Sequence, residues 1–238
     1  MPEMNRRLVL KTRPEGIPGP EHFDLEQVEV GEPGVGEVLV QNVYLSVDPA
    51  QRGWVNAVAN YSKPVGIGEV MRAFAVGEVI GSRDDALPEG SFVTGILGWQ
   101  DYAVASPQAL RRIDPAAAPI SAHLGVLGIN GISAYFGLLD IGRPKPGETV
   151  VVSTAAGAVG SCVGQIAKIG GCRAVGITGG AEKVGLCREV YGYDAAVDYK
   201  ASGDLGAELR AACPDGIDVY FDNTGGAISD TVMGLINV

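Results

Sequence analysis

A glycine-rich turn between an apolar strand and a helix constrains the fold of this chain more than any other feature. The strand is expected over 149–153 (TVVVS), and Ala155, Gly157 and Gly160 follow at G-x-G-x-x-G spacing, with alanine replacing the first glycine. A helix is expected over 157–169. In such a unit the later glycines let the backbone approach a pyrophosphate and let the helix pack on the strand, while helix amides face the phosphates. The pattern predicts a dinucleotide-binding domain, and a tight turn that binds nothing is the alternative.

Strands and helices alternate through the second half of the chain. The expected strands lie at 149–153, 173–177, 195–199 and 217–222, and the expected helices at 157–169, 181–191, 204–212 and 226–235. This alternation predicts right-handed crossovers and an α/β fold with a Rossmann-type, doubly wound parallel sheet. Because that fold has about six strands and only four are found, we expect the chain to end inside its fold.

The first half of the chain has the pattern of a β-rich domain. Within 37–47, Val43, Leu45 and Val47 alternate with other residues, which is typical of a half-buried strand. Further short strands are expected at 76–81, 91–97 and 100–104. We therefore expect a sandwich or barrel. The β-rich domain is expected over 1–125 and the dinucleotide-binding domain over 126–238. A buried helical connection between them is expected over 121–139.

Charge and residue usage exclude several classes of function. The net charge of −10 disfavours nucleic acid or an anionic membrane as the main partner, because either would need a concentrated cationic surface. The two histidines, His22 and His123, lie far apart and no local motif adds carboxylates, so no metal site is expected.

The cysteines and the N-terminus indicate where such a protein works. No CxxC pair is present, and we expect four buried, reduced thiols at Cys162, Cys172, Cys187 and Cys213. The N-terminus lacks a signal-peptide core, and no apolar stretch is long enough to span a membrane. We therefore expect a cytoplasmic protein.

The residues after the second expected strand bear on the choice of dinucleotide. NAD sites carry an acid about 20 residues after the glycine pattern, but 176–180 reads GITGG and has none. A carboxylate there would repel a 2′-phosphate, so its absence permits NADPH or NADP⁺. Lys183 and Tyr199 are the candidates for contacting this phosphate. The alternatives are a solvated surface lysine and a packing residue at a strand end.

Several linked motifs resemble those of one known family. They are LSVDP (45–49) with Arg52-Gly53, GWQDY (98–102), LGVLG (124–128), AYFGLLDIG (134–142), AAGAVGS (155–161) with VGQIAK (163–168), and FDNTGG (221–226). Together they resemble the zinc-independent branch of the medium-chain dehydrogenase/reductases. Within that branch they are similar to the NADPH-dependent alkenal and enone double-bond reductases, such as the prostaglandin and curcumin reductases. The similarity runs through nearly the whole chain.

The resemblance implies a GroES-like β-rich catalytic domain and a Rossmann cofactor domain, with the active site between them. It also implies reduction of the C=C bond of α,β-unsaturated aldehydes and ketones. Hydride would pass from the nicotinamide to the β-carbon, and a proton would then be added at the α-carbon. Such chemistry needs hydride positioning and stabilisation of charge on the carbonyl oxygen rather than a metal. A small-molecule substrate and, for a full-length chain, a homodimer are implied as well.

The family's cofactor residues carry over onto matching positions. The pyrophosphate turn corresponds to Gly157, Ala158, Val159 and Gly160. The lysine that binds the 2′-phosphate corresponds to Lys183, and the tyrosine at the strand end corresponds to Tyr199. The asparagine beside the nicotinamide-side ribose corresponds to Asn223. Without the resemblance, Asn223 has the alternative of an Asx turn ahead of two glycines.

The substrate side departs from the family pattern. Candidate pocket residues are Ala50, Arg52, Trp99 and Tyr102, and ordinary core packing is the alternative for the two aromatic residues. Ala50 stands where the family has a pocket-lining tyrosine, so a wider and less polar site is expected. The family tyrosine implicated near the substrate falls beyond Val238, so no catalytic residue is assigned and impaired turnover is expected. A quinone reductase and a non-catalytic NADP(H)-binding protein are the rival functions.

Overall fold

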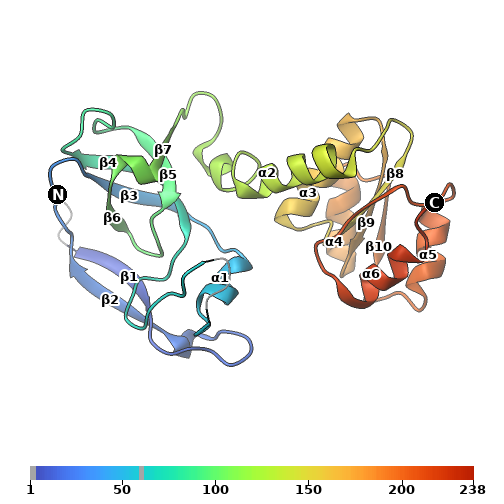
Figure 1. The fold of residues 1–238 in the computed structure, drawn as a ribbon, viewed down its shortest axis with the longest axis horizontal. Helices are drawn as coiled ribbons and strands as arrows, with labels where there is room; N and C mark the ends of the chain where they lie inside the picture. Colours follow the sequence, from blue (N-terminus) through green and yellow to red (C-terminus); the bar gives the residue numbers. More distant parts are fainter. Residues whose placement is uncertain (1–3, 59–61) are drawn as a thin grey trace. The chain divides into compact units, whose positions relative to one another are not determined.

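The computed structural model describes residues 4–58 and 62–238 of the chain (Figure 1). The chain forms two compact units, the N-terminal unit (residues 1–124) and the C-terminal unit (residues 125–238). The first is built around antiparallel strands and the second around parallel strands covered by helices.

The N-terminal unit contains a five-stranded antiparallel sheet. Its strands lie in the order β6 (Tyr102–Ala105), β3 (Val38–Leu45), β4 (Phe74–Ser82), β5 (Phe92–Ile96) and β7 (Leu110–Ile113). A separate antiparallel pair is formed by β1 (Met4–Leu10) and β2 (Phe23–Glu29). The four strands expected here are confirmed, but the half-buried face expected at Val43, Leu45 and Val47 is wrong. These residues are exposed, because β3 is buried only in its first half and ends at Leu45. The sequence reasoning missed β1, β2 and β7, which carry charged residues and lack a clean alternation of buried and exposed positions.

Two apolar clusters hold the N-terminal unit together. Alternate residues of β3 and β4, including Val38, Val40 and Val79, point into the sheet interior and are fully buried, as the two-residue period of a strand requires. The second cluster gathers around the short helix α1 (Ala50–Trp54) and comprises Leu10, Trp54, Val55, Val65 and Met71. The remaining short helices are η1 (Pro20–His22), η2 (Pro107–Ala109) and η3 (Ile120–Leu124).

The C-terminal unit contains a four-stranded parallel sheet. The strand order is β10 (Ala195–Asp198), β9 (Arg173–Thr178), β8 (Thr149–Ser153) and β11 (Val219–Phe221). In chain order this is 3-2-1-4, the order with which a Rossmann sheet begins. All four expected strands are confirmed, with ends that differ by no more than two residues. The strand order reverses between β8 and β11, and in this fold class ligands bind beyond the carboxyl ends of the strands at such a point.

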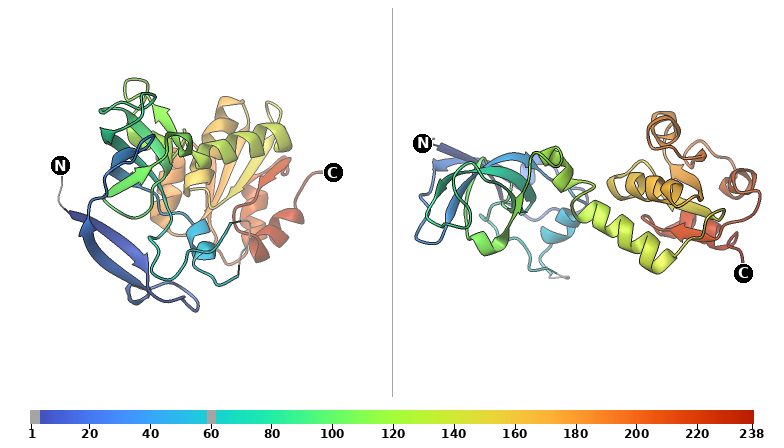
Figure 2. Two further views of the ribbon diagram at one scale, coloured as in Figure 1. Left: turned by 60° about the vertical axis from the view of Figure 1, so that its left-hand side comes forward. Right: turned by 90° about the horizontal axis from the view of Figure 1, so that it is seen from above.

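Helices cover both faces of the parallel sheet (Figure 2). Val150 and Val152 of β8 pack on one face with Val163, while Val151 packs on the other with Leu209 and Val232. The helices of this unit are α2 (Ile129–Phe136), η4 (Gly137–Gly142), α3 (Ala158–Ile169), α4 (Ala181–Gly185), η5 (Leu186–Val190), α5 (Leu205–Ala212) and α6 (Gly226–Met233). The helix expected over 181–191 is divided, because the chain passes from α4 into the π-helical η5.

One expectation for this region is wrong. The apolar stretch 121–139 was expected to be buried, but Ile132, Tyr135 and Phe136 are about half exposed, at 47%, 51% and 53%. The reason is that α2 is a short helix that packs on α3 and buries only one face, including Ala134, which leaves its other side chains uncovered. Within the described ranges, no helix has the length and apolar character needed to cross a membrane.

Candidate functional site

The turn after β8 is held in a left-handed bend by its own backbone. Thr154 has φ of 51°, and its carbonyl accepts the amide of Gly157 at 2.8 Å. The Ala155 amide donates to the Ile177 carbonyl on β9 at 3.1 Å, which ties the bend to the sheet. The strand–turn–helix arrangement expected from the sequence is therefore confirmed.

Steric contacts explain the residue types in this turn. A Cβ atom on Gly160 would lie 2.3 Å from the Thr154 carbonyl oxygen, and one on Gly157 would lie 2.8 Å from the Thr154 methyl carbon. Both glycines are thus required by the turn itself. Ala155 has no positive φ and is fully buried against Gly176, so an alanine fits at the position of the first glycine.

The start of α3 is an anion-binding arrangement. Gly157 is the N-cap residue and makes no side-chain cap. The amides of Ala158, Val159 and Gly160 occupy the first turn, where N–H groups have no partner within the helix. Together with the helix dipole, these amides favour a negatively charged group placed beyond the carboxyl end of β8.

Two lysines, Lys183 and Lys200, lie near the corner where β9 and β10 end. A Cβ atom on Gly179 would lie 3.0 Å from the Tyr199 ring and 2.9 Å from Cε of Lys200, so both side chains pack over this glycine. Lys183 is exposed in α4, which begins directly after Gly180. Neither lysine makes a salt bridge within residues 4–58 and 62–238. Lys200 was missed from the sequence, although it follows Tyr199 directly.

The carboxylate at this corner is directed toward the backbone. Asp198 accepts the amides of Gly180 at 2.9 Å and Lys200 at 3.0 Å. These hydrogen bonds, led by the one from Gly180, lower the pKa of Asp198 below its ordinary 3.8. The ionised Asp198 therefore shapes the loop that carries Lys183, and its charge is compensated by amides.

At the reversal point of the sheet, Ser153 and Asn223 bring the ends of β8 and β11 together. The Asn223 amide donates to Ser153 Oγ at 2.7 Å, and Asn223 Nδ2 donates to the Ser153 carbonyl at 2.8 Å. The turn that follows is closed by Asp222, which accepts the amides of Thr224 and Gly225, both at 2.9 Å. The Asx turn considered for Asn223 is thus made by its neighbour.

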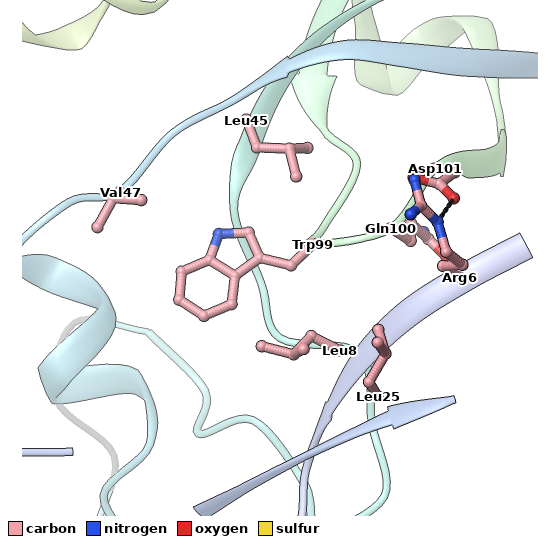
Figure 3. A pocket seen from close by; sticks show the side chains of 8 residues that line it. All are labelled: Arg6, Leu8, Leu25, Leu45, Val47, Trp99, Gln100 and Asp101. Atoms are coloured by element: carbon pink, nitrogen blue, oxygen red, sulfur yellow. Dashed lines mark hydrogen bonds and ion pairs between the residues drawn. The ribbon is translucent and has the colours of Figure 1, made fainter. Parts of the chain in front are cut away.

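The N-terminal unit contains an apolar pocket of about 340 Å³ (Figure 3). The indole of Trp99 forms one wall, and its Nε1 donates to the Ser46 carbonyl at 3.0 Å, so the polar edge of the ring is already satisfied. The pocket is lined by Arg6, Leu8, Leu25, Leu45, Val47, Trp99, Gln100 and Asp101. Arg6 and Asp101 pair at 2.7 Å, so the rim is close to neutral. The pocket therefore suits an apolar group.

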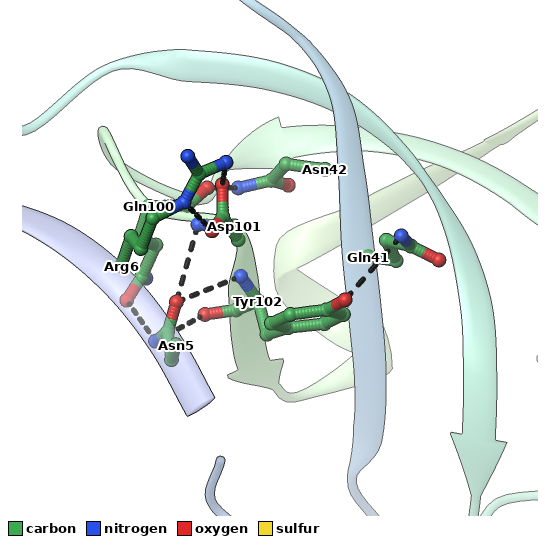
Figure 4. A network of polar contacts seen from close by, with 7 residues as sticks. All are labelled: Asn5, Arg6, Gln41, Asn42, Gln100, Asp101 and Tyr102. Atoms are coloured by element: carbon green, nitrogen blue, oxygen red, sulfur yellow. Dashed lines mark hydrogen bonds and ion pairs between the residues drawn. The ribbon is translucent and has the colours of Figure 1, made fainter. Parts of the chain in front are cut away.

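A polar network adjoins the pocket, with which it shares Arg6, Gln100 and Asp101 (Figure 4). The side chain of Asn5, which is buried, accepts the amides of Asp101 and Tyr102 at 3.1 Å and 3.0 Å and donates to the Tyr102 carbonyl at 3.0 Å. The Tyr102 hydroxyl accepts from Gln41 at 3.4 Å. Tyr102 is thus outside the pocket lining, in the network that joins β1 to β6.

The other two substrate-side candidates lie on α1. Ala50 packs partly buried against the apolar cluster that Trp99 also contacts. Arg52 donates to the Gly16 carbonyl at 2.7 Å and to the side chain of Asn56, which fastens the loop before β2 to α1. The sequence identified these positions but gave no indication of their partners.

The four cysteines all lie in the C-terminal unit. All four cysteines are free, and three are buried while Cys162 is intermediate. Burial raises the pKa of Cys187 to about 11, and burial likewise raises that of Cys213 to about 11. In the part of the chain that the structure describes, no group of three or more His, Cys, Asp or Glu residues is arranged to hold a metal ion.

Comparisons with known proteins match both units. A family model described as the N-terminal domain of oxidoreductase matches residues 6–113, and one described as zinc-binding dehydrogenase matches residues 158–238. The chain is 48% identical over 235 residues to the NADPH-dependent curcumin reductase of Escherichia coli (strain K12), covering 99% of this chain and 68% of that protein. It is 44% identical over 227 residues to prostaglandin reductase 1 of Rattus norvegicus, covering 94% of this chain and 67% of that protein.

A solved structure is also similar to this chain over nearly its whole length. The crystal structure of CurA in complex with NADPH from Vibrio vulnificus superposes with a TM-score of 0.90 at 44% sequence identity. The match covers 98% of this chain and 68% of that one. At this level of identity, the similarity extends beyond the general fold.

Proposed function

Because this chain belongs to the zinc-independent medium-chain dehydrogenase/reductases, in the group of NADPH-dependent alkenal and enone reductases, we propose that it binds NADPH and reduces C=C bonds conjugated to a carbonyl. Its GroES-like β-rich unit carries the substrate side, and its Rossmann unit carries the cofactor side. The observations that carry the proposal are the start of α3, which no side chain caps, and the corner beyond β9, where Lys183 and Lys200 form no salt bridge with another described residue.

The turn of residues 154–160 fits the diphosphate of the cofactor. The amides of Ala158, Val159 and Gly160 would donate to the phosphate oxygens, and Gly157 leaves the approach free of a side chain. Cβ atoms on Gly157 or Gly160 would collide with Thr154, so the shape of this cradle depends on both glycines.

The corner beyond β9 fits the 2′-phosphate of the adenosine ribose. Lys183 would supply a cation there, and the Tyr199 hydroxyl would supply a hydrogen bond. No carboxylate lies within 176–180, and Asp198 is engaged by backbone amides. The corner therefore favours the phosphorylated cofactor over NADH.

Asn223 is assigned to the nicotinamide-side ribose. Its Nδ2 group is used by the Ser153 carbonyl, which leaves Oδ1 to accept from a ribose hydroxyl. When bound, NADPH would supply the hydride for the β-carbon of the substrate, and the proton at the α-carbon would come from solvent. Asn223 would contribute by holding the nicotinamide end of the cofactor in a fixed position relative to the substrate.

On the substrate side, we assign the apolar part of the enone to the pocket beside Trp99. Ala50, which replaces the tyrosine of the family pattern, lies outside the lining of this pocket and packs against the apolar cluster that Trp99 also contacts. Arg52 and Tyr102 are bound to other protein groups, and we assign them to supporting the loops around the pocket. A cytoplasmic location is proposed because the four cysteines are free thiols. The homodimer implied by the resemblance can be checked by light scattering.

The test is an assay with three acceptors. Loss of NADPH is followed with an enone, with a quinone and without acceptor, and NADPH deuterated at the reactive carbon labels the product. We expect oxidation with the enone and deuterium at its β-carbon. Oxidation with the quinone alone, or deuterium at the carbonyl carbon, would overturn the assignment.

A further inference from the structure

Asp222 is the centre of a polar cluster that links both strands at the reversal point to α6. Its Oδ1 accepts from the hydroxyls of Ser153 at 3.1 Å and Tyr220 at 3.0 Å, and its Oδ2 accepts from the hydroxyl of Ser229 at 2.6 Å. The amides of Thr224 and Gly225 donate to Oδ1 at 2.9 Å each, and the Thr224 hydroxyl donates to it at 3.4 Å. One carboxylate thus organises the turn between β11 and α6.

This carboxylate also determines how Ser153 is oriented. Ser153 is fully buried, and its hydroxyl has a single proton, which it donates to Asp222. Its oxygen is then free to accept the Asn223 amide at 2.7 Å. An acceptor at position 222 therefore fixes Ser153, and Ser153 in turn holds Asn223.

Ionisation of Asp222 keeps this arrangement in place. Burial alone would raise the pKa of Asp222, but hydrogen bonds from Gly225, Ser229, Thr224 and Tyr220 lower it well below the ordinary 3.8. At neutral pH the carboxylate of Asp222 is therefore ionised and can only accept hydrogen bonds.

We propose that Asp222 is a positioning residue for the cofactor: through Ser153 it holds Asn223 with Oδ1 turned toward a hydroxyl of the nicotinamide-side ribose. This inference rests on the proposed function, because it takes the cofactor to lie beyond the carboxyl ends of β8 and β11. Asp222 itself touches neither cofactor nor substrate. A carboxylate that only stabilised the turn would affect folding but would not select between ligands.

The experiment compares two ligands and two matched variants. NADPH spans both halves of the site, whereas adenosine 2′,5′-bisphosphate carries the adenosine-side phosphates and lacks the nicotinamide ribose. Asp222→Ala removes the acceptor of the Ser153 hydroxyl. It should weaken NADPH by roughly 3- to 10-fold, the scale of one hydrogen bond, and leave the bisphosphate unchanged. The matched control is Asp218→Ala, at the opposite end of β11, where the carboxylate accepts the Thr149 amide and Asn237 Nδ2, each at 2.8 Å. This control should alter neither affinity.

A double-mutant cycle tests whether Asp222 acts through Asn223. In the Asn223→Ala background, Asp222→Ala should have no further effect on NADPH affinity. Equal weakening of both ligands, or effects that add in the double variant, would overturn the positioning role. If Asp222→Ala does not fold, Ser153→Ala keeps the carboxylate and should show the same selective loss for NADPH.

Failure of the broader proposal would be distinguishable. If the unmodified chain bound neither NADPH nor the bisphosphate, the proposed function would fall, and this inference with it. If the unmodified chain bound both and Asp222→Ala bound NADPH equally well, only the role of Asp222 would fall.

Discussion

Replacing Lys183 with alanine tests the cofactor preference directly. Lys183 is exposed, follows the loop of Gly179 and Gly180, and makes no salt bridge with another described residue. Its removal therefore leaves no protein group unpaired. The change removes one positive charge from the corner where we assign the 2′-phosphate.

The size of the effect follows from exposure. Two unit charges 4 Å apart attract by about 1 kcal/mol in water and about 4 kcal/mol at an effective dielectric constant near 20. Because Lys183 is solvated and screened by salt, the effect should fall toward the lower end of this range, at about 1–2 kcal/mol. This corresponds to a roughly 5- to 30-fold weaker affinity for NADPH. NADH, which lacks the 2′-phosphate, should bind almost as before.

Calorimetric titration with both cofactors measures the difference. Lys145→Ala is the matched control, because Lys145 is also exposed but lies in the turn before β8, at the opposite end of the sheet. It should change neither affinity. The loss for NADPH in Lys183→Ala should shrink as salt is added. An equal loss for NADPH and NADH would refute the reasoning.

Three further predictions concern the turn, the pocket support and acid stability. Gly160→Ala places a Cβ atom 2.3 Å from the Thr154 carbonyl, so NADPH titration should show at least tenfold weaker binding, and unchanged binding would contradict the cradle. Asn5→Ala removes the side chain that accepts the Asp101 and Tyr102 amides and donates to the Tyr102 carbonyl, although the Asp101 amide keeps the Arg6 carbonyl as a second acceptor. It should lower the free energy of unfolding by about 2 kcal/mol in urea denaturation, whereas no change would show that water replaces the side chain. The pKa of Asp222 is lowered from 3.8 on folding, so its contribution to stability is present above about pH 4 and is lost as the pH falls below it. Lowering the pH from about 5 to about 3 should therefore lower the thermal denaturation midpoint of the unmodified chain more than that of Asp222→Asn. An equal fall of the midpoint in both proteins would contradict this.

Local steric rules made the C-terminal unit predictable from sequence. The β-branched run of β8 reads as a buried strand, and Gly157 and Gly160 are required by contacts within one turn, so their spacing alone reveals the bend. The missed strand β2, by contrast, has a pattern in which exposed and intermediate positions do not separate cleanly into two faces.

Contacts between distant segments could not be read from the sequence. Asp222 and Ser153 lie 69 residues apart and meet only because the chain returns to β8 after two other strands and their helices. The packing of Lys200 over Gly179 likewise depends on the pairing of β9 with β10. The exposure of α2 was misjudged because apolar composition does not tell how much of a helix its neighbours cover.

A crystal structure of this chain grown with NADPH tests the central claim most directly. The account predicts diphosphate oxygens within hydrogen-bond distance of the amides at the start of α3, with the 2′-phosphate beside Lys183 and Tyr199. Cofactor bound elsewhere on the chain, or a 2′-phosphate directed away from Lys183, would contradict it.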